Sequence, residues 1–224
     1  MKKTKFYEVF ERKEGRHRRL YTKNLNPGKD VYGEYLIKEG KTEYRQWDPK
    51  RSKIAAAILK GLNQLGAAPG QSVLYLGAST GTTVSHISDI VGNKGMVFAL
   101  DFAPRTTRDL VFLAKERENI APILADANQP ETFKKLIPKE VDWIFQDIAQ
   151  RQQAEIFLKN VKQFLKKGGL ACIAIKARSV DVSKKPRLVF KDVRKLLEKE
   201  VVITDYRTLD PFEKDHAFFT VKKK

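Results

Sequence analysis

A glycine-containing turn follows an apolar strand near the middle of the chain. The segment Val73-Leu-Tyr-Leu-Gly77-Ala-Ser-Thr-Gly81-Thr-Thr83 indicates a buried strand that runs into a turn and then into a helix. Glycines at such a turn let a ligand approach the backbone, and the first amides of the helix can bind anionic groups. The spacing G-x-x-x-G differs from the G-x-G-x-x-G of dinucleotide sites, so the turn alone also fits a simple tight connection.

Acidic residues end the strands that follow this turn. Asp101 comes 24 residues after Gly77, where a carboxylate can accept hydrogen bonds from ribose hydroxyls, and Phe102 beside it can stack on adenine. Asp126 ends the next strand and can hold the adenine amino group, and Asp147 ends the strand after that. Any one of these acids could be a helix cap or a solvated loop residue. Together they indicate a site for S-adenosylmethionine rather than for a nicotinamide dinucleotide.

Alternating strands and helices are predicted to position these residues. A period of two, or a short apolar run, predicts strands at 72–76, 96–100, 120–124, 141–145, 170–175, 201–208 and 217–221. Helical spacing predicts helices at 52–65, 82–91, 104–116, 131–136, 152–165 and 186–199. This order predicts a doubly wound α/β fold with a mostly parallel, seven-stranded, Rossmann-like sheet. The last two strands have no helix between them, so we expect an antiparallel hairpin at one edge.

The N-terminal part has a different pattern. Short alternating segments separated by turns such as Asn26-Pro-Gly28 and Glu39-Gly-Lys41 predict a small antiparallel β unit. We therefore divide the chain into an N-terminal β domain, residues 1–49, and a larger α/β domain with the S-adenosylmethionine site, residues 50–224. Because two-stranded hairpins are marginal alone, the small unit should pack on the larger one.

The net charge indicates a polyanionic partner. The 224 residues include 44 Lys and Arg against 27 Asp and Glu, a net charge of +17, and residues 1–53 alone hold 16 basic and 8 acidic residues. Nucleic acid fits this excess better than a membrane, because no segment pairs a basic face with a large apolar one. The alternative is a lysine-rich surface of the kind found in heat-adapted proteins.

Cysteine and histidine usage adds little chemistry. The single Cys172 lies in an apolar strand and can form no internal disulfide, and His17 and His86 show no metal-ligand spacing. We expect no metal, no membrane segment and a soluble, intracellular protein.

Several motifs together resemble the fibrillarin family in its archaeal form. They are Asn26-Pro-Gly-Lys-Asp-Val-Tyr-Gly-Glu34, Trp47-Asp-Pro-Lys-Arg-Ser-Lys-Ile-Ala-Ala-Ala57, Tyr75-Leu-Gly-Ala-Ser-Thr-Gly-Thr-Thr83, Asp147-Ile-Ala-Gln150, Ile175-Lys-Ala-Arg-Ser179 and Pro211-Phe-Glu-Lys-Asp-His216. The resemblance spans nearly the whole chain and implies a class I methyltransferase fold. The cofactor contacts it implies, with those inferred above, are Gly77, Ala78, Thr82, Thr83, Asp101, Phe102, Asp126, Ala127, Asp147, Ile148, Ala149 and Gln150.

The resemblance also implies a reaction. Fibrillarin-like proteins transfer a methyl group from S-adenosylmethionine to a ribose 2′-hydroxyl in rRNA and tRNA, and the implied catalytic set here is Lys53, Asp147, Lys176 and His216. We assign Lys176 as the general base, on the expectation that burial and the nearby charge of Lys53 favour its neutral form. Asp147 would orient Lys176 and the hydroxyl, while Lys53 and His216 would position the ribose.

The implied assembly is a ribonucleoprotein. It contains a C/D box guide RNA and the target RNA, a Nop-family scaffold protein, and a kink-turn-binding protein of the ribosomal type. Two alternatives remain open at this point: a mainly structural ribonucleoprotein subunit with a vestigial cofactor site, and methylation of a protein glutamine. In an archaeal cell, which has no nucleus, the location would be cytoplasmic.

Overall fold

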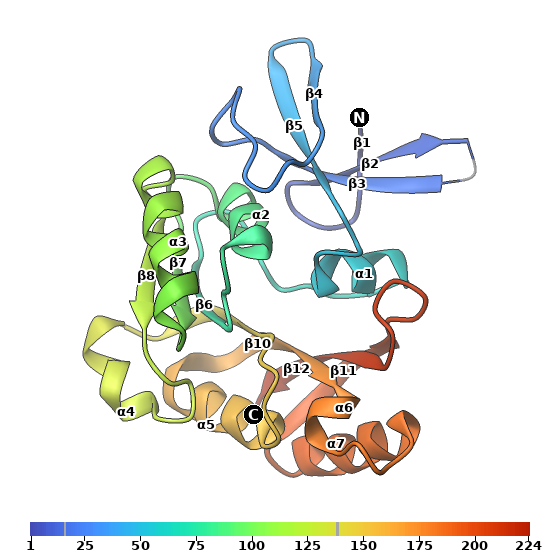
Figure 1. Ribbon diagram of the computed structural model, residues 1–224, viewed down its shortest axis with the longest axis vertical. Helices are drawn as coiled ribbons and strands as arrows, with labels where there is room; N and C mark the ends of the chain where they lie inside the picture. Colours follow the sequence, from blue (N-terminus) through green and yellow to red (C-terminus); the bar gives the residue numbers. More distant parts are fainter. Residues whose placement is uncertain (16, 138) are drawn as a thin grey trace.

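Two sheets organise the molecule (Figure 1). The structure is a computed structural model and describes residues 1–15, 17–137 and 139–224. Among these residues, a five-stranded sheet with the order β1-β2-β3-β5-β4 contains β1 (Lys2–Lys3), β2 (Val9–Glu14), β3 (His17–Lys23), β4 (Leu36–Glu39) and β5 (Thr42–Trp47). A seven-stranded sheet with the order β11-β12-β10-β9-β6-β7-β8 contains β6 (Ser72–Leu76), β7 (Met96–Asp101), β8 (Ile120–Leu124), β9 (Val141–Gln146), β10 (Leu165–Lys176), β11 (Val201–Thr208) and β12 (His216–Lys223).

Helices connect the strands of the larger sheet. They are α1 (Lys53–Leu59), α2 (Thr82–Val91), α3 (Pro104–Glu116), α4 (Pro130–Phe133) with the 3₁₀ turn η1 (Lys134–Leu136), α5 (Gln153–Phe164), α6 (Ala177–Val180) and α7 (Pro186–Glu200). Three of them, α3, α4 and α7, begin with proline, whose fixed φ suits the first turn and whose missing N–H costs nothing there.

Alternate residues of each central strand face opposite layers. In β6, Val73 and Tyr75 join a core with α1, α2 and α3, whereas Leu74 and Leu76 join a second core with α5 and α7. Figure 1 shows the corresponding layers, with α1 to α3 on one side of the sheet and α5 to α7 on the other. This arrangement confirms the predicted doubly wound fold. The predicted antiparallel edge is confirmed as well, because β12 pairs antiparallel with both β10 and β11.

The strand order creates one switch point. From β6 the chain moves outward to β7 and β8, and then returns to place β9 on the other side of β6. In open α/β sheets, ligands bind outside the carboxyl ends of the strands at such a reversal. The carboxyl ends of β6 and β9 are followed by Gly77 and Asp147, so the fold brings the predicted cofactor turn and the predicted catalytic aspartate to one place.

Helix α1 is shorter than its pattern predicts. The helical spacing extends from residue 52 to 65, but the helix ends at Leu59, and Gly61 follows with φ +84°. Leu62 and Leu65 still reach the core from an irregular segment. Their apolar spacing therefore reflects burial rather than helix, which explains why the periodicity overestimates the length. The short α6 was not predicted, because four residues are too few for a periodic signal.

Buried charges join the small sheet to α2. The Arg45 guanidinium, on β5, bonds Glu34 (2.5 Å), Asp89 (2.9 Å) and the Ser85 hydroxyl (2.8 Å), and Arg117 bonds the other oxygen of Asp89 at 2.6 Å. All of these groups are removed from solvent or nearly so. Charges buried this way are stabilising only when every partner is present. The expected packing of the N-terminal unit on the larger one is therefore made largely through α2.

The chain leaves the small sheet at Trp47, the end of β5, and enters α1 at Lys53, before the larger sheet begins with β6 at Ser72. The boundary that we place between residues 49 and 50 falls within this connection. The independence of the two parts as domains stays a prediction.

Candidate active site

The glycine turn is in direct contact with the segment after β9. Gly77 has φ +83°, and a Cβ built on it would lie 2.2 Å from the carbonyl oxygen of Asp147. The amides of Gly77 and Ala78 both donate to the Leu100 carbonyl at 2.9 Å. Glycine is therefore required here by the neighbouring backbone as well as by the positive φ. The close approach that the sequence suggested for a ligand is made, at Gly77, by the protein itself.

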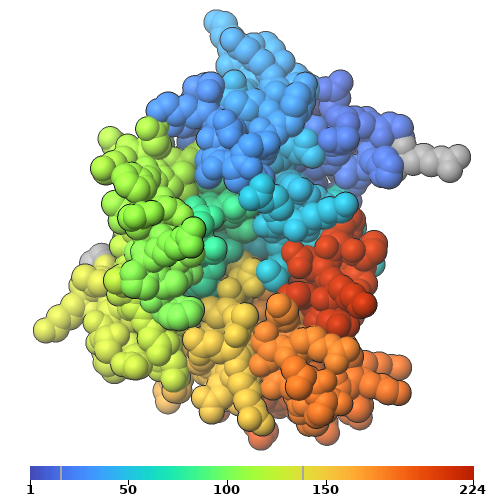
Figure 2. All heavy atoms as spheres, in the orientation of Figure 1, coloured from blue at the N-terminus to red at the C-terminus, as the bar shows by residue number. Residues whose placement is uncertain are grey.

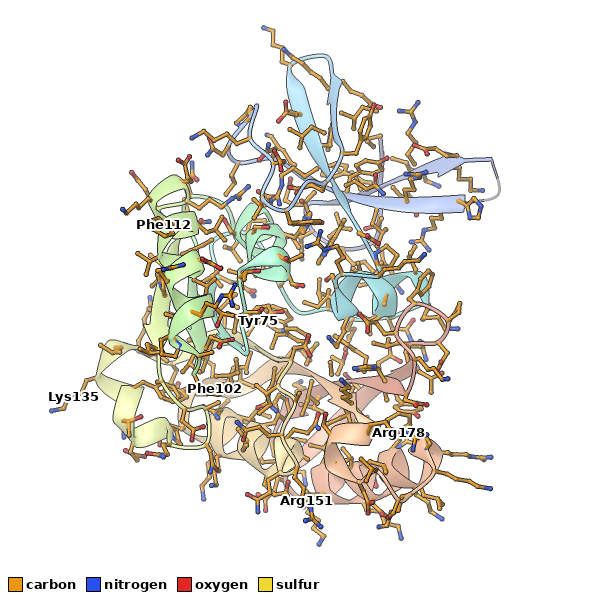
Figure 3. All side chains as sticks on the ribbon, viewed as in Figure 1. Tyr75, Phe102, Phe112, Lys135, Arg151 and Arg178 are labelled. Carbon is orange, nitrogen blue, oxygen red and sulfur yellow. The ribbon has the colours of Figure 1, made fainter. Side chains whose placement is uncertain are left out.

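Asp101 organises the end of β7. Its carboxylate accepts hydrogen bonds from the amides of Ser79 (2.8 Å) and Ala103 (3.0 Å) and from the Thr106 hydroxyl (2.9 Å). A carboxylate offers about four acceptor positions, so one position remains for a ribose hydroxyl. Phe102, next in the chain, is 67% exposed, which is unusual for a phenyl ring, and Figure 3 shows it near the start of α3. An exposed ring beside an oriented carboxylate fits an adenosine.

The remaining predicted cofactor contacts surround the same strand ends. Asp126 is half-buried and uses one carboxylate oxygen to accept from the Asn128 amide at 2.8 Å, and Ala127 is buried. Ile148 and Gln150 are half-buried and Ala149 is exposed in the irregular segment after Asp147. These positions are compatible with their predicted roles, which stay predictions.

Thr82 and Thr83 open α2 in different environments. Thr82 is half-buried, whereas Thr83 is 8% exposed and donates its hydroxyl to the Ser52 hydroxyl at 3.1 Å. No side chain among the described residues caps the amides of this first turn. Free helix N-terminal amides suit a carboxylate such as that of the methionine moiety. Together with Asp101 and Phe102, they form a donor and acceptor set that fits S-adenosylmethionine.

Lys53 and Asp147 form an ion pair. The Lys53 Nζ lies 2.8 Å from Asp147 Oδ2, and both side chains are about one-fifth to one-quarter exposed. Burial lowers the pKa of Lys53, but the charge of Asp147, the hydrogen bond between them and the charge of Glu213 outweigh burial, so the pKa is raised. Lys53 therefore stays protonated at neutral pH. A protonated Lys53 suits the predicted positioning role and not that of a base.

Lys176 and His216 are neighbours across two strands. They face each other in the antiparallel pairing of β10 with β12, so their side chains leave the same face of the sheet. The His216 Nδ1 lies 2.7 Å from the Lys214 carbonyl, which can only accept, so Nδ1 carries a proton and Nε2 is the free nitrogen of the neutral ring. Lys176 is exposed. The expected burial of this lysine is therefore wrong, because it lies past the last core residue of β10, Ile175.

Four chain segments converge at this site. Figure 2 shows the cyan segment that begins α1, the yellow segment after β9 and the red segment before β12 meeting near the centre of one face of the molecule. The structure thus brings together the predicted set of Lys53, Asp147, Lys176 and His216. In the part of the chain that the structure describes, no group of three or more His, Cys, Asp or Glu is placed to hold a metal ion.

Two residues of the site were not found from the sequence. Gln153, buried at the start of α5, donates to the Gln150 carbonyl (2.9 Å) and accepts from the Lys176 amide (3.2 Å), so it joins the segment after Asp147 to the end of β10. Ser52 caps α1 and receives the Thr83 hydroxyl. The bonds from Gln153 to Lys176 and from Thr83 to Ser52 join residues far apart in the chain, so no local pattern predicts them.

The comparisons with known proteins agree with this geometry. A sequence model of the Fibrillarin family matches residues 1–224. The chain belongs to the fibrillarin family. The fibrillarin-like rRNA/tRNA 2′-O-methyltransferase of Thermococcus onnurineus is 53% identical over 205 residues, which cover 92% of this chain and 90% of that protein. The resemblance read from the motifs is therefore confirmed.

Solved fibrillarin structures share the whole fold. A Methanococcus jannaschii fibrillarin described as a pre-rRNA processing protein has a TM-score of 0.94 at 48% identity, covering 99% of this chain and 96% of that one. Aeropyrum pernix fibrillarin, solved with natively bound S-adenosyl-L-methionine, has a TM-score of 0.89 at 43% identity, covering 98% and 96%. A fibrillarin in complex with Nop5p has a TM-score of 0.89 at 38% identity, covering 99% and 100%.

Among residues 1–15, 17–137 and 139–224, no helix combines the length and the apolar character that crossing a bilayer requires.

Proposed function

We propose that this chain transfers the methyl group of S-adenosylmethionine to the ribose 2′-hydroxyl of target nucleotides in rRNA and tRNA. The observation that carries this proposal is the ion pair of Lys53 with Asp147 at the sheet's switch point, beside the facing residues Lys176 and His216. The relative from Thermococcus onnurineus is named for this activity, and the Aeropyrum pernix fibrillarin binds this cofactor.

The reaction asks for a positioned hydroxyl and the removal of its proton. When bound, the cofactor supplies an electrophilic methyl group on a sulfonium, so no metal is needed to activate the donor. The hydroxyl is a weak nucleophile, and a positioned base and in-line geometry contribute most of what the protein can add. Asp147, fixed by Lys53, can accept the hydrogen bond of the ribose hydroxyl and hold it in line.

Lys53 and Lys176 have different proposed roles. Lys53 remains cationic because of Asp147, so it positions rather than accepts a proton. Lys176 has no hydrogen-bond or ion-pair partner for its Nζ within the described residues, which leaves the amine available to a substrate. An RNA that covers Lys176 removes water from it, and loss of water favours the neutral amine. Lys176 is therefore our assigned general base, and we assign the Nε2 of His216 to contact and position the ribose.

The target is selected by other molecules of a ribonucleoprotein. The net charge of +17 suits phosphate contacts, which grip RNA without reading its sequence. A Nop-family protein is the expected scaffold, in line with the known fibrillarin complex with Nop5p. A C/D box guide RNA pairing with the target RNA, and a kink-turn-binding protein of the ribosomal type, complete the proposed assembly. Its proposed location is the cytoplasm of an archaeal cell.

A reconstituted particle tests this function. The chain, guide RNA, scaffold and kink-turn-binding protein are combined with methyl-labelled S-adenosylmethionine and a short target RNA. We expect label on one paired ribose, a shift of the label when the guide is shifted by a nucleotide, and no label on a target with a 2′-deoxyribose there. Cofactor binding without transfer in the complete particle would favour the scaffold alternative. Label on a glutamine side chain would favour the protein-methylation alternative.

A further inference from the structure

Two buried hydroxyls join the helix that carries Lys53 to the helix of the cofactor turn. Thr83, the second residue of α2, donates its hydroxyl to the hydroxyl of Ser52 at 3.1 Å. Ser52 also caps α1, because it accepts from the Ala55 amide at 3.5 Å. Ser52 is 2% exposed and Thr83 is 8% exposed, so water does not replace this contact easily.

These hydroxyls complete a closed series of contacts around the site. Ser52 is followed directly by Lys53, whose Nζ bonds Asp147 at 2.8 Å. The carbonyl of Asp147 packs against Gly77, and the turn from Gly77 leads back to Thr83. A displacement of the first turn of α2 therefore reaches Lys53 by two routes, one through Asp147 and one through Ser52.

The two helices are held in different ways. Helix α2 is fixed from its other side, because Ser85 and Asp89 bond the buried guanidinium of Arg45. Helix α1 has seven residues and ends before Gly61, so the burial of Ile54 to Ile58 in the core holds it rather than helix stability of its own. Helix α2 is thus held from Ser85 onward, and its first residues meet the start of α1 through Thr83 and Ser52.

We propose that Ser52 and Thr83 are positioning residues that couple cofactor binding at the glycine turn to the placement of Lys53 on Asp147. Cofactor bound at the turn orders the first turn of α2, which holds the Thr83 hydroxyl toward Ser52 and so holds the start of α1. Coupling between two sites is reciprocal, so loosening Ser52 weakens cofactor binding although Ser52 lies on another helix. The turnover part of this inference rests on the proposed function, whereas the binding part does not.

A double-mutant cycle measures the coupling on the full chain. The variants Ser52→Ala, Thr83→Val and the double variant are titrated with S-adenosylhomocysteine by calorimetry. We expect each single change to weaken binding by roughly three- to tenfold. The double variant should bind S-adenosylhomocysteine as tightly as the single variant with the lower affinity, because both changes break the same contact. Thr83→Ser keeps the hydroxyl and should restore binding.

A matched control separates coupling from a general loss of stability. Ser88 lies on the same helix and donates its buried hydroxyl to Asn119 at 2.7 Å, away from Ser52. Ser88→Ala should lower the melting temperature as Thr83→Val does and leave the binding constant unchanged. The inference is overturned if Thr83→Val weakens binding while Ser52→Ala does not, since Thr83 would then act on the cofactor alone. Additive effects in the double variant would overturn it as well.

Hydrogen–deuterium exchange gives a second readout that needs no RNA. S-adenosylhomocysteine should slow amide exchange in α1 of the unmodified chain and of Ser88→Ala, but not in Thr83→Val. Equal protection of α1 in all of them would contradict the coupling. Both readouts remain interpretable if the chain transfers no methyl group to RNA, so a failure of the inference and a failure of the proposed function can be told apart. In the active particle, Thr83→Val should lower kcat and leave the KM for RNA unchanged.

Discussion

At the scale of single residues, the site depends on contacts between segments rather than on any one functional group. Gly77 is needed because its neighbour across the switch point is the carbonyl of Asp147. Asp101 shapes the turn by accepting from the Ser79 amide, and its predicted contact with a ribose would use the acceptor position that remains. A motif residue that suggests ligand binding can therefore use most of its hydrogen bonds to stabilise the loop around the ligand site.

Gly77→Ala tests the close approach at the turn. A side chain at φ +83° costs roughly 1–3 kcal/mol by itself, and the clash with Asp147 adds to it. We expect the free energy of unfolding to fall by more than about 2 kcal/mol. We also expect a loss of S-adenosylhomocysteine binding. Denaturant unfolding and calorimetry measure the two.

Gly70→Ala is the control for Gly77→Ala, because Gly70 has φ +78° and nothing within 4 Å of its built Cβ. It should show the backbone cost alone, with cofactor binding intact. Equal effects of the two substitutions would mean that the contact with Asp147 is unimportant.

At the scale of elements, the sequence predicts the larger sheet well and the contacts between elements poorly. Apolar runs bounded by turns placed β6, α2 and α3, because strand and helix periods are local properties. The predicted end of α1 was wrong, because Leu62 and Leu65 are buried without being helical. The bond from Thr83 to Ser52 joins residues 31 apart in the chain, and no local pattern predicts such a pair.

Helix α2 also carries a buried histidine. His86 lies 2.7 Å from both the Thr22 hydroxyl and the Tyr32 hydroxyl, and its ring stacks on Trp47. Thr22 donates its proton to Asp89, so the His86 Nδ1 donates to Thr22. In the neutral ring Nε2 is then an acceptor toward the Tyr32 hydroxyl, which also lies 3.0 Å from the Gln46 carbonyl. Burial, and then the charges of Arg45 and Arg117, lower the pKa of His86 well below its ordinary value of 6.5. The folded protein therefore keeps this ring neutral.

His86 makes stability depend on pH. Below about pH 6.5 the unfolded chain binds a proton at this residue and the folded chain does not, so unfolding free energy falls as pH falls. The expected slope from His86 is about 1.4 kcal/mol per pH unit. Urea unfolding of the unmodified chain and of His86→Gln between pH 7 and pH 5 measures it. The variant should show a shallower dependence, and identical slopes would refute the neutral, buried assignment.

At the scale of the whole molecule, charge and fold have separate tasks. The fold gathers the proposed catalytic set at the switch point, and the excess of basic residues, densest in residues 1–53, suits a polyanion without specifying its sequence. In the proposed assembly, base pairing by a guide RNA selects the target.

Salt should weaken RNA binding by the isolated chain. Each phosphate contact releases condensed counterions, so the affinity falls as a power of the salt concentration. For an unrelated RNA, we expect about tenfold or greater loss between 50 and 200 mM salt, as a few phosphate contacts require. Filter binding at several salt concentrations gives the slope. A salt-independent affinity, or a marked preference for one RNA sequence, would contradict the proposed division of tasks.

The most direct test of the account is the rate of methyl transfer by Lys176→Met in the complete particle. Lys94→Met is its control, because Lys94 is exposed in the turn before β7, at the opposite end of the sheet. Under single-turnover conditions we expect Lys176→Met to slow transfer by roughly 10²-fold or more, with S-adenosylhomocysteine affinity kept, and Lys94→Met to transfer normally. A rate for Lys176→Met within about twofold of the unmodified chain would contradict the assignment of Lys176 as the base.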